Sequence, residues 1–210
     1  SSLFLITVSD LFHFYVVLHH VQSASVVVGE TKTSLPVPST TAAAAATTKT
    51  TTADSVRVPD DCNTLEEAVK RVHEDGRLTT IIVGEGKHQT GSVFLKIESA
   101  MNIVGDPEVA KEKIVVLGGI RFMKGIQGNC HLEHLTLRQA KSYGVYGESS
   151  FTMEDVLVEQ CDFNGVVAIG TGVVGRCTNV EVRQCGDSGV VACNGASITL
   201  IGAKTTVHHN

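Results

Sequence analysis

Glu133, Glu154 and Asp155, with His134 beside them, are the residues of this chain best placed to do acid–base chemistry together. Carboxylates that share a site shift one another's pKa, so one can act as a general acid and another as a general base, or the group can hold a cation. We take the three carboxylates as the catalytic candidates. Solvated side chains on an exposed face would look the same in the sequence, and we favour that simpler interpretation.

Other residue types that support chemistry lack the spacing that they need. The six cysteines contain no CxxC pair of the kind that binds zinc, and we expect free, buried thiols. His208 and His209 are adjacent, so on a strand they point to opposite faces and do not share a metal. The sequence therefore predicts no metal site and no bound cofactor.

The acidic candidates belong to an internal repeat, which is the main structural signal in the chain. The period is 21 residues from Leu135 to Val156 and 24 residues from Val156 to Val180. A coil of two or three short strands needs about that length at roughly 3.3 Å per residue, turns included. Each repeat is followed by a Gly-Val pair. The three aligned segments are 132–140 (LEHLTLRQA), 153–161 (MEDVLVEQC) and 177–185 (CTNVEVRQC).

Successive repeats are expected to place like residues on like at the ~4.8 Å spacing of neighbouring strands. Apolar positions then form buried columns. The remaining positions form, in order, an amide ladder, a row of alternating charge on an outer face, a stack of small residues and a column of glycines, which we expect to take positive φ in a turn. The apolar columns are Leu132/Met153/Cys177, Leu135/Val156/Val180 and Val145/Val166/Val190. The others, in the order above, are Gln139/Gln160/Gln184, Arg138/Glu159/Arg183, Ala140/Cys161/Cys185 and Gly144/Gly165/Gly189.

Upstream of the repeats, the pattern predicts one helix and several strands. Thr64-Leu65-Glu66-Glu67 is a capping-box sequence that can satisfy the first free amides of a helix. Apolar residues at helical spacing follow as far as Val72, and Gly76 can end the helix. Strands are expected over 79–84, 93–97, 100–104, 114–117 and 120–122.

The segments Val58-Pro59, the capping-box helix, 79–88 (TTIIVGEGKH) and the repeats together resemble the opening of a pectin-lyase-like β-helix domain. Lys87-His88 stand where that family usually has an aromatic residue. The resemblance covers roughly residues 56–210. It implies an all-β fold, a right-handed parallel β-helix solenoid with a short N-terminal capping helix. A leucine-rich repeat has a similar period, but its signature matches only in part and the units lack its helical arm.

The chain divides into three regions. Residues 1–30 form an apolar segment, the remnant of a signal peptide or a misassigned start, and only the first would imply secretion or the cell surface. Charged and histidine residues interrupt its apolar run, so a membrane anchor is not expected. Residues 31–55 are a Thr/Ala/Pro-rich linker, too poor in large apolar groups to fold. Residues 56–210 are the β-helix domain. We expect it to be truncated at its C-terminal end, because Lys204–Asn210 begins a fourth unit that no Gly-Val pair follows.

The charge balance excludes one class of partner. Lys and Arg number 17 against 22 Asp and Glu, for a formal net charge of −5, so the basic footprint of a nucleic-acid-binding protein is missing. Carbohydrate and protein are the remaining partners, and the oligomeric state is left open.

Two function classes fit the fold. The first, which we favour because the coils are regular and lack long insertions, is a noncatalytic scaffold that binds carbohydrate or protein along the solenoid face. Tyr143, Tyr146 and Phe163 are its candidates for stacking on sugar. The alternative is a polysaccharide lyase or glycoside hydrolase, with its site in coils beyond this chain or near Glu133 and Glu154. Ca²⁺ belongs only to the lyase alternative, and the Asn-Thr-Asp and Gly-His-Gly signatures of hydrolases with this fold are absent.

Overall fold

A computed structural model describes residues 25–29 and 54–210, and within them every element except two is a β-strand. The helical elements are α1 (Leu65–Glu74) and a short 3-10 helix, η1 (Lys111–Lys113). The strands are β1 (Ser25–Gly29), β2 (Ser55–Val58), β3 (Thr80–Val83), β4 (Gly86–Ile97), β5 (Asn102–Gly105), β6 (Ile114–Phe122), β7 (Cys130–Glu133), β8 (Thr136–Arg138), β9 (Val145–Gly147), β10 (Phe151–Glu154), β11 (Leu157–Glu159), β12 (Val166–Ile169), β13 (Val174–Thr178), β14 (Glu181–Arg183), β15 (Val190–Cys193), β16 (Ser197–Ile201) and β17 (Thr206–His208).

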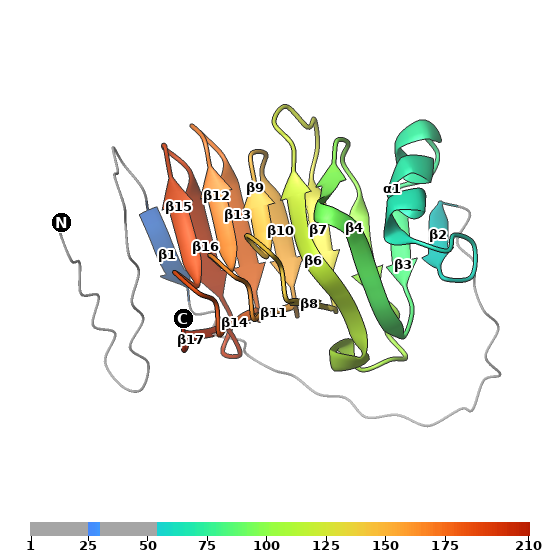
Figure 1. Cartoon of the computed structure of the whole chain (residues 1–210). Helices are drawn as coiled ribbons and strands as arrows, with labels where there is room; N and C mark the ends of the chain where they lie inside the picture. Colours follow the sequence, from blue (N-terminus) through green and yellow to red (C-terminus); the bar gives the residue numbers. More distant parts are fainter. Residues whose placement is uncertain (1–24, 30–53) are drawn as a thin grey trace, which may run out of the picture.

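The strands pair in parallel with strands of the neighbouring coils, which makes the wall of a solenoid (Figure 1). An 8-stranded sheet has the order β1-β16-β13-β10-β7-β5-β3-β2, and a 9-stranded sheet has the order β15-β12-β9-β6-β8-β11-β14-β17, with β4 paired to β6. β6 pairs with β8 through Val115–Leu117 and with β9 through Ile120–Phe122, so the second sheet has two faces. This topology confirms the predicted parallel β-helix.

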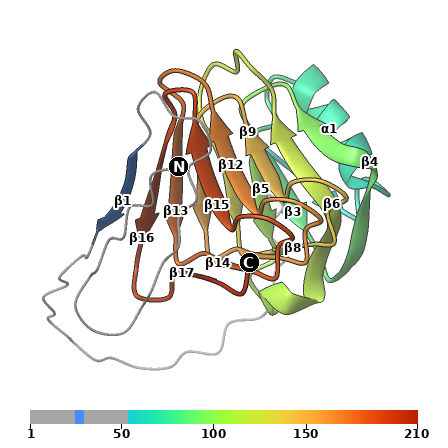
Figure 2. The same ribbon diagram turned by 60° about the vertical axis from the view of Figure 1, so that its left-hand side comes forward.

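Three faces therefore run along the solenoid. Face A carries the 8-stranded sheet, including β7, β10 and β13. Face B carries the first part of β6 with β8, β11, β14 and β17. Face C carries the later parts of β4 and β6 with β9, β12 and β15, and Figure 2 shows β9, β12 and β15 side by side.

The stacking register is the one that the repeat predicts. Met153 is the Cα partner of both Leu132 and Cys177, and Val166 is the partner of both Val145 and Val190. The Leu135/Val156/Val180 column is also buried. Alternate residues thus point into one continuous core, and burying such columns is the main favourable term in the folding of the solenoid.

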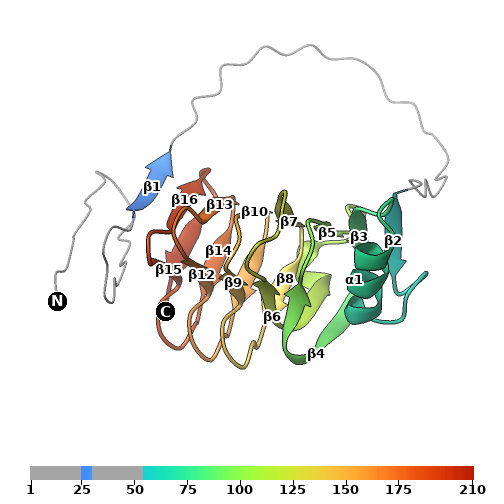
Figure 3. The same ribbon diagram turned by 90° about the horizontal axis from the view of Figure 1, so that it is seen from above.

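The helix α1 covers the first coil, as its capping-box sequence predicts. Thr64 accepts a hydrogen bond from the Glu67 amide at 3.1 Å, and the Glu67 carboxylate accepts one from the Asn63 amide at 3.0 Å. Its apolar side packs on β2, β3 and β4, which Figure 3 shows from above. The buried residues of the helix are Leu65, Ala68, Val69 and Val72.

The alternating-charge row of face B is present but is not a fully outer feature. Glu159 accepts hydrogen bonds from Arg138 Nε at 2.5 Å and from Arg183 Nε at 2.9 Å. The two guanidinium groups lie over the carboxylate, whose side chain is only 4% exposed. Arg183 also pairs with Glu181 at 2.7 Å. A buried charge is tolerated because both partners are in place, and removing one would leave it uncompensated.

Two expectations about local conformation are wrong. The separate strands expected over 114–117 and 120–122 form the single strand β6. Positive φ occurs not at the glycines that follow the repeats but at the corners on either side of the short face B strands. Those corner residues are His134, Asp155 and Asn179 on one side and Gln139, Gln160, Gln184 and His209 on the other. In the second corner the Gln160 amide donates to Gln184 at 3.4 Å, part of the expected amide ladder.

Gly144, Gly165 and Gly189 are instead required because the coils approach too closely for a side chain. A Cβ on Gly165 would lie 2.6 Å from the Gly189 carbonyl oxygen and 3.1 Å from Cys185 Sγ. A Cβ on Gly144 would lie 2.7 Å from the Gly165 carbonyl oxygen. At these two glycines the obstructing atoms include backbone of the next coil, which cannot move without breaking the strand ladder. At Gly189 they are the side chains of Val207 and Asn210.

The cysteines are free thiols, as expected, and five are buried while Cys193 is half-buried. Burial raises the pKa of Cys130 to about 11 and that of Cys177 to about 12. The pKa of Cys161 is also raised, by its hydrogen bond with Cys185 on the next coil and by burial. Cys130, Cys161 and Cys177 are therefore protonated at neutral pH and act as small apolar residues of the core.

The predictions for residues 1–24 and 30–53, which include the signal-peptide remnant and nearly all of the linker, lie outside the described residues. Residues 25–29 form β1, which pairs in parallel with β16. In the described part of the chain, no helix has both the length and the apolar character needed to span a bilayer.

Replacing Gly165 with Ala should destabilise the domain by about 2 kcal/mol, because the added Cβ overpacks two coils. Gly76→Ala is the matched control, since nothing lies within 4 Å of the position that its Cβ would take and its φ is not positive. Its effect should stay within about 0.5 kcal/mol. Urea unfolding followed by circular dichroism measures both changes, and equal effects of the two substitutions would contradict the close-approach explanation.

Candidate functional site

Glu133 and Glu154 lie next to each other on the outer side of face A. They are Cα partners on β7 and β10, and both follow inward-pointing residues of the core. Glu154 is exposed, whereas Glu133 accepts a hydrogen bond from His131 Nε2 at 3.2 Å. The two carboxylates thus share an open face, which is the arrangement that the acid–base hypothesis needs.

Asp155 and His134 are separated from that pair because each occupies the corner after its strand. Asp155 binds Lys111 Nζ at 2.6 Å and His134 Nδ1 at 2.7 Å, and His134 Nε2 donates to the Val109 carbonyl at 2.8 Å. Thr136 donates to the Lys111 carbonyl at 2.9 Å, which fastens η1 over face B. This network has a structural role, and it occupies the carboxylate that the sequence offers as a third catalytic candidate.

The titration of this network follows from its contacts. Burial alone lowers the pKa of His134, but hydrogen bonds to Val109 and Asp155 outweigh that effect and raise it above the ordinary 6.5. Burial alone raises the pKa of Asp155, but hydrogen bonds from Lys111 and His134 outweigh it and lower the pKa below the ordinary 3.8. Both groups are therefore charged together over the intervening pH range.

A second cluster on face A contains residues that the sequence analysis did not select. Thr152 Oγ1 lies 2.7 Å from His131 Nδ1 and 3.1 Å from Asn129 Nδ2. His131 and Thr152 are Cα partners on β7 and β10, one residue before Leu132 and Met153 of the repeat. Aligning the repeats one residue further upstream would therefore have brought the imidazole and the hydroxyl together.

An aromatic cluster occupies the outer side of face C. Tyr143 stacks on Tyr146 with ring centroids 5.1 Å apart, and Phe163 lies 6.1 Å from Tyr143. Phe94, which the sequence analysis did not select, joins them at 6.3 Å from Tyr143 and 6.4 Å from Tyr146. Phe94 comes from β4, Tyr143 and Tyr146 come from the coil of β9, and Phe163 comes from the coil of β12. Phe163 is 53% exposed, whereas the other three residues are half-buried.

Charged groups border the aromatic cluster. The Arg121 guanidinium lies 5.2 Å from the centre of the Tyr146 ring, a cation–π distance, and Arg121 also binds Glu148 at 2.9 Å. Glu148 thereby holds the guanidinium in place over the ring. The cluster presents flat apolar surfaces next to hydrogen-bonding groups of fixed orientation.

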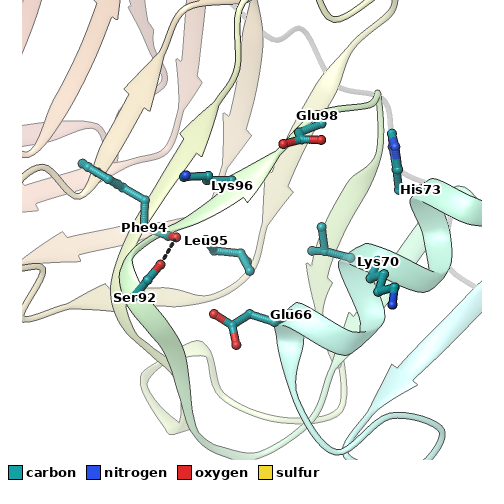
Figure 4. A pocket seen from close by; sticks show the side chains of 9 residues that line it. Glu66, Lys70, His73, Ser92, Phe94, Leu95, Lys96 and Glu98 are labelled. Atoms are coloured by element: carbon teal, nitrogen blue, oxygen red, sulfur yellow. Dashed lines mark hydrogen bonds between the residues drawn. The ribbon is translucent and has the colours of Figure 1, made fainter.

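A shallow pocket of about 330 Å³ opens between α1 and β4 (Figure 4). Leu95 and Val69 form its apolar floor, and Glu66, Ser92 and Glu98 stand at its border. Phe94 borders this pocket and belongs to the aromatic cluster, and its side chain points away from Leu95 and Glu66 (Figure 4). No group of three His, Cys, Asp or Glu side chains able to hold a metal occurs among residues 25–29 and 54–210.

Comparisons with known proteins concern the fold alone. No protein-family model matches the chain, and no curated protein matches it. Among solved structures, it is similar to the catalytic domain of a GH87 alpha-1,3-glucanase in complex with nigerose, with a TM-score of 0.42 and 13% identity over 71% of this chain and 33% of that one. A substituted form of that catalytic domain in complex with tetrasaccharides also has a TM-score of 0.42 and 13% identity, over 77% of this chain and 38% of that one. The chain thus spans little more than a third of these domains.

The His134 network predicts a bell-shaped pH dependence of stability. Because the pKa of His134 is raised in the folded protein, its protonation stabilises the fold below pH 6.5, and this stabilisation is lost as the pH rises through the pKa of the folded state. Because the pKa of Asp155 is lowered, the stabilisation from its carboxylate is lost as the pH falls through the pKa of its folded state. His134→Asn keeps a residue that tolerates positive φ but removes the cation. The variant should lose about 1 kcal/mol near pH 5, after allowing for solvent screening, and less at pH 9. Urea unfolding across pH tests this, with the exposed His73→Asn as control, and a pH-independent difference would contradict it.

Proposed function

We propose that this domain is a carbohydrate-active parallel β-helix that binds a glycan chain along the aromatic cluster of face C. The observation that carries the proposal is the gathering of four aromatic rings from three coils onto one outer surface, namely Phe94, Tyr143, Tyr146 and Phe163. Phe163 is exposed and the other three rings are half-buried beside it. A contiguous apolar patch outside the core marks an interaction surface in soluble proteins. A pyranose ring presents a flat C–H face of matching size, which stacks on such rings.

The groups around the rings favour sugar over protein as the partner. Arg121 and Glu148 are fixed by their ion pair and can bind hydroxyl groups, which alternate with C–H faces around a sugar ring. The pocket beside Phe94 adds further polar side chains at one end of the same surface. A stable protein interface needs about 800 Å² from each partner, with an apolar centre, and the small, polar-bordered cluster does not suit it as well.

Phe163→Ala should weaken glycan binding by about tenfold, since one exposed stacking surface, worth on the order of 1 kcal/mol, is lost. Phe163 is exposed, so the fold should be unaffected. Val174→Ala is the matched control, because Val174 is also an exposed apolar residue, at 45%, but lies on β13 of face A. Titration calorimetry with neutral and acidic oligosaccharides, including glucan tetrasaccharides of several linkages and oligogalacturonates, measures the change. Equal effects of the two substitutions, or binding of protein but no glycan, would contradict the proposal.

A hydrolase is the second candidate, and the adjacent positions of Glu133 and Glu154 support it. The backbones of neighbouring strands lie about 4.8 Å apart, so the carboxyl groups of two paired residues can approach the ~5–5.5 Å separation found in retaining glycosidases. Face A is open, so a sugar chain can reach both groups. In this scheme Glu154 would be the nucleophile or acid, and Glu133 its partner.

Cleavage assays separate binding from hydrolysis. The hydrolase candidate predicts product from a glycan that the domain binds, and loss of at least about 100-fold in rate in Glu154→Gln, because a carboxyl group in the reaction is replaced by an amide. Glu108→Gln, at an exposed acidic residue away from the pocket and the aromatic cluster, is the control. Assays with and without Ca²⁺ test the lyase form of the candidate. Binding without product would leave the domain a glycan-binding scaffold and exclude Glu133 and Glu154 as a hydrolytic pair.

A further inference from the structure

We infer that Thr152, His131 and Glu133 form a hydroxyl–imidazole–carboxylate relay on face A that hydrolyses carboxylic esters. The inference goes beyond the proposed glycan binding and does not depend on it. It rests on side chains from two neighbouring strands, 21 residues apart in the chain, that contact one another in the order that nucleophilic catalysis requires. The nucleophile candidate, Thr152, is on β10, and its base and the group that orients the base are on β7.

The hydrogen bonds determine which atom does what. Glu133 can only accept, so at its 3.2 Å contact His131 Nε2 carries the proton. In the neutral imidazole Nδ1 is then the acceptor, and the Thr152 hydroxyl donates to it at 2.7 Å. Another acceptor for this hydroxyl, the Cys130 carbonyl, lies farther away at 3.4 Å. The basic nitrogen therefore faces the hydroxyl whose proton it must remove.

Donors for a developing oxyanion lie beside the hydroxyl. The Asn129 side-chain amide donates to Thr152 Oγ1 at 3.1 Å, so it already points at the reacting atom. Arg176 is the Cα partner of Thr152 on β13, and its exposed side chain projects from the same outer surface. A neutral amide at the hydroxyl and a cationic side chain on the next strand of the same face are groups that can stabilise negative charge on a carbonyl oxygen.

The relay is held rigidly and remains accessible. Leu132 and Met153, which are partners in the buried core, fix the backbone positions of the residues that precede them. The His131 side chain is 20% exposed and the Glu133 side chain 43%, so an ester and a water molecule can reach the imidazole from solvent. A site on two paired strands keeps its geometry better than one on mobile loops.

The reaction proceeds in two balanced steps. Thr152 Oγ1 attacks the ester carbonyl while its proton passes to His131 Nδ1, and collapse of the tetrahedral intermediate breaks the ester C–O bond as that proton passes to the leaving alcohol. Water then attacks the acyl-threonine, giving one proton to His131 Nδ1, which returns it to Thr152 Oγ1 as the carboxylic acid leaves. The net change is ester plus water to acid plus alcohol, with no oxidation or reduction.

The test uses p-nitrophenyl acetate as the probe and has two readouts. The first is the release of p-nitrophenol. The second is the mass of the intact protein, followed by peptide mapping to locate the acetyl group. The wild-type chain should release p-nitrophenol above the buffer rate and carry acetyl on Thr152. Thr152→Val keeps the shape but removes the hydroxyl and should abolish both signals, whereas Thr152→Ser should keep them. His131→Gln should lower the rate by at least about 100-fold.

Glu133 is a positioning residue, so its variants are read differently. Glu133→Ala should lower kcat more than it changes KM, and Glu133→Gln should restore part of the loss because its amide oxygen still accepts from Nε2. Thr199→Val is the matched control. Thr199 lies on β16 and Thr152 lies on β10, and the two pair with Arg176 of β13 from opposite sides. Among the described residues, Thr199 has no hydrogen bond to a histidine such as the one that Thr152 makes.

Circular dichroism and thermal melting confirm that each variant is folded. No hydrolysis and no adduct in the wild-type chain would overturn the inference, as would acetyl mapped to lysine or tyrosine rather than Thr152. Equal rates in Thr152→Val and wild type would overturn it as well. Loss of glycan binding in Phe163→Ala without loss of ester hydrolysis would show that the two functions are separate.

Discussion

The in-register parallel ladder between coils is the constraint on which the rest of this structure depends. Each coil closes its hydrogen bonds with the coil before and the coil after it, so every residue stands over its counterpart at the spacing of neighbouring strands. Residues 21 to 24 apart in the chain thereby become nearest neighbours, as Met153 is to Leu132 and Cys177. A substitution in one coil acts first on these stacked partners, as in other solenoids.

Close approach of the coils explains why certain residue types recur. Gly144 and Gly165 stand where the next coil's carbonyl leaves no room for a Cβ, and Gly189 stands where side chains of the next coil leave none. The corners carry asparagine, aspartate, histidine and glutamine at positive φ, and the first three of these residue types adopt it most readily. The same closeness makes charge order important. Glu159 is stable in its buried position because arginines of the two adjoining coils lie over it, and two like charges in that column would repel at short range.

Alternation along each strand gives the faces different chemistry while they share one core. Face A exposes hydroxyl, imidazole, amide and carboxylate groups, and face C exposes aromatic rings with a fixed ion pair. Because both faces are built from the same coils, a polymer bound across the rings and a reaction on the polar face would use separate side chains. The Lys111–Asp155–His134 network occupies the corner between faces A and B and fastens η1 there, so its charges serve stability.

The repeat alone was enough to predict the solenoid, its buried columns and the stacking of Glu133 on Glu154, because a constant internal pattern specifies which residues meet one coil apart. The capping helix was also predictable, since its signals are local. Only the tertiary structure decided the role of the three glycines, the burial of Glu159 and the loss of Asp155 to an ion pair with Lys111. It also brought Phe94 to Tyr143, and Thr152 to His131. Lys111 and Phe94 come from segments outside the aligned repeats, where no period specifies which residues become neighbours. The direction in which the chain turns at a corner depends on backbone angles, and residue type constrains these angles only weakly.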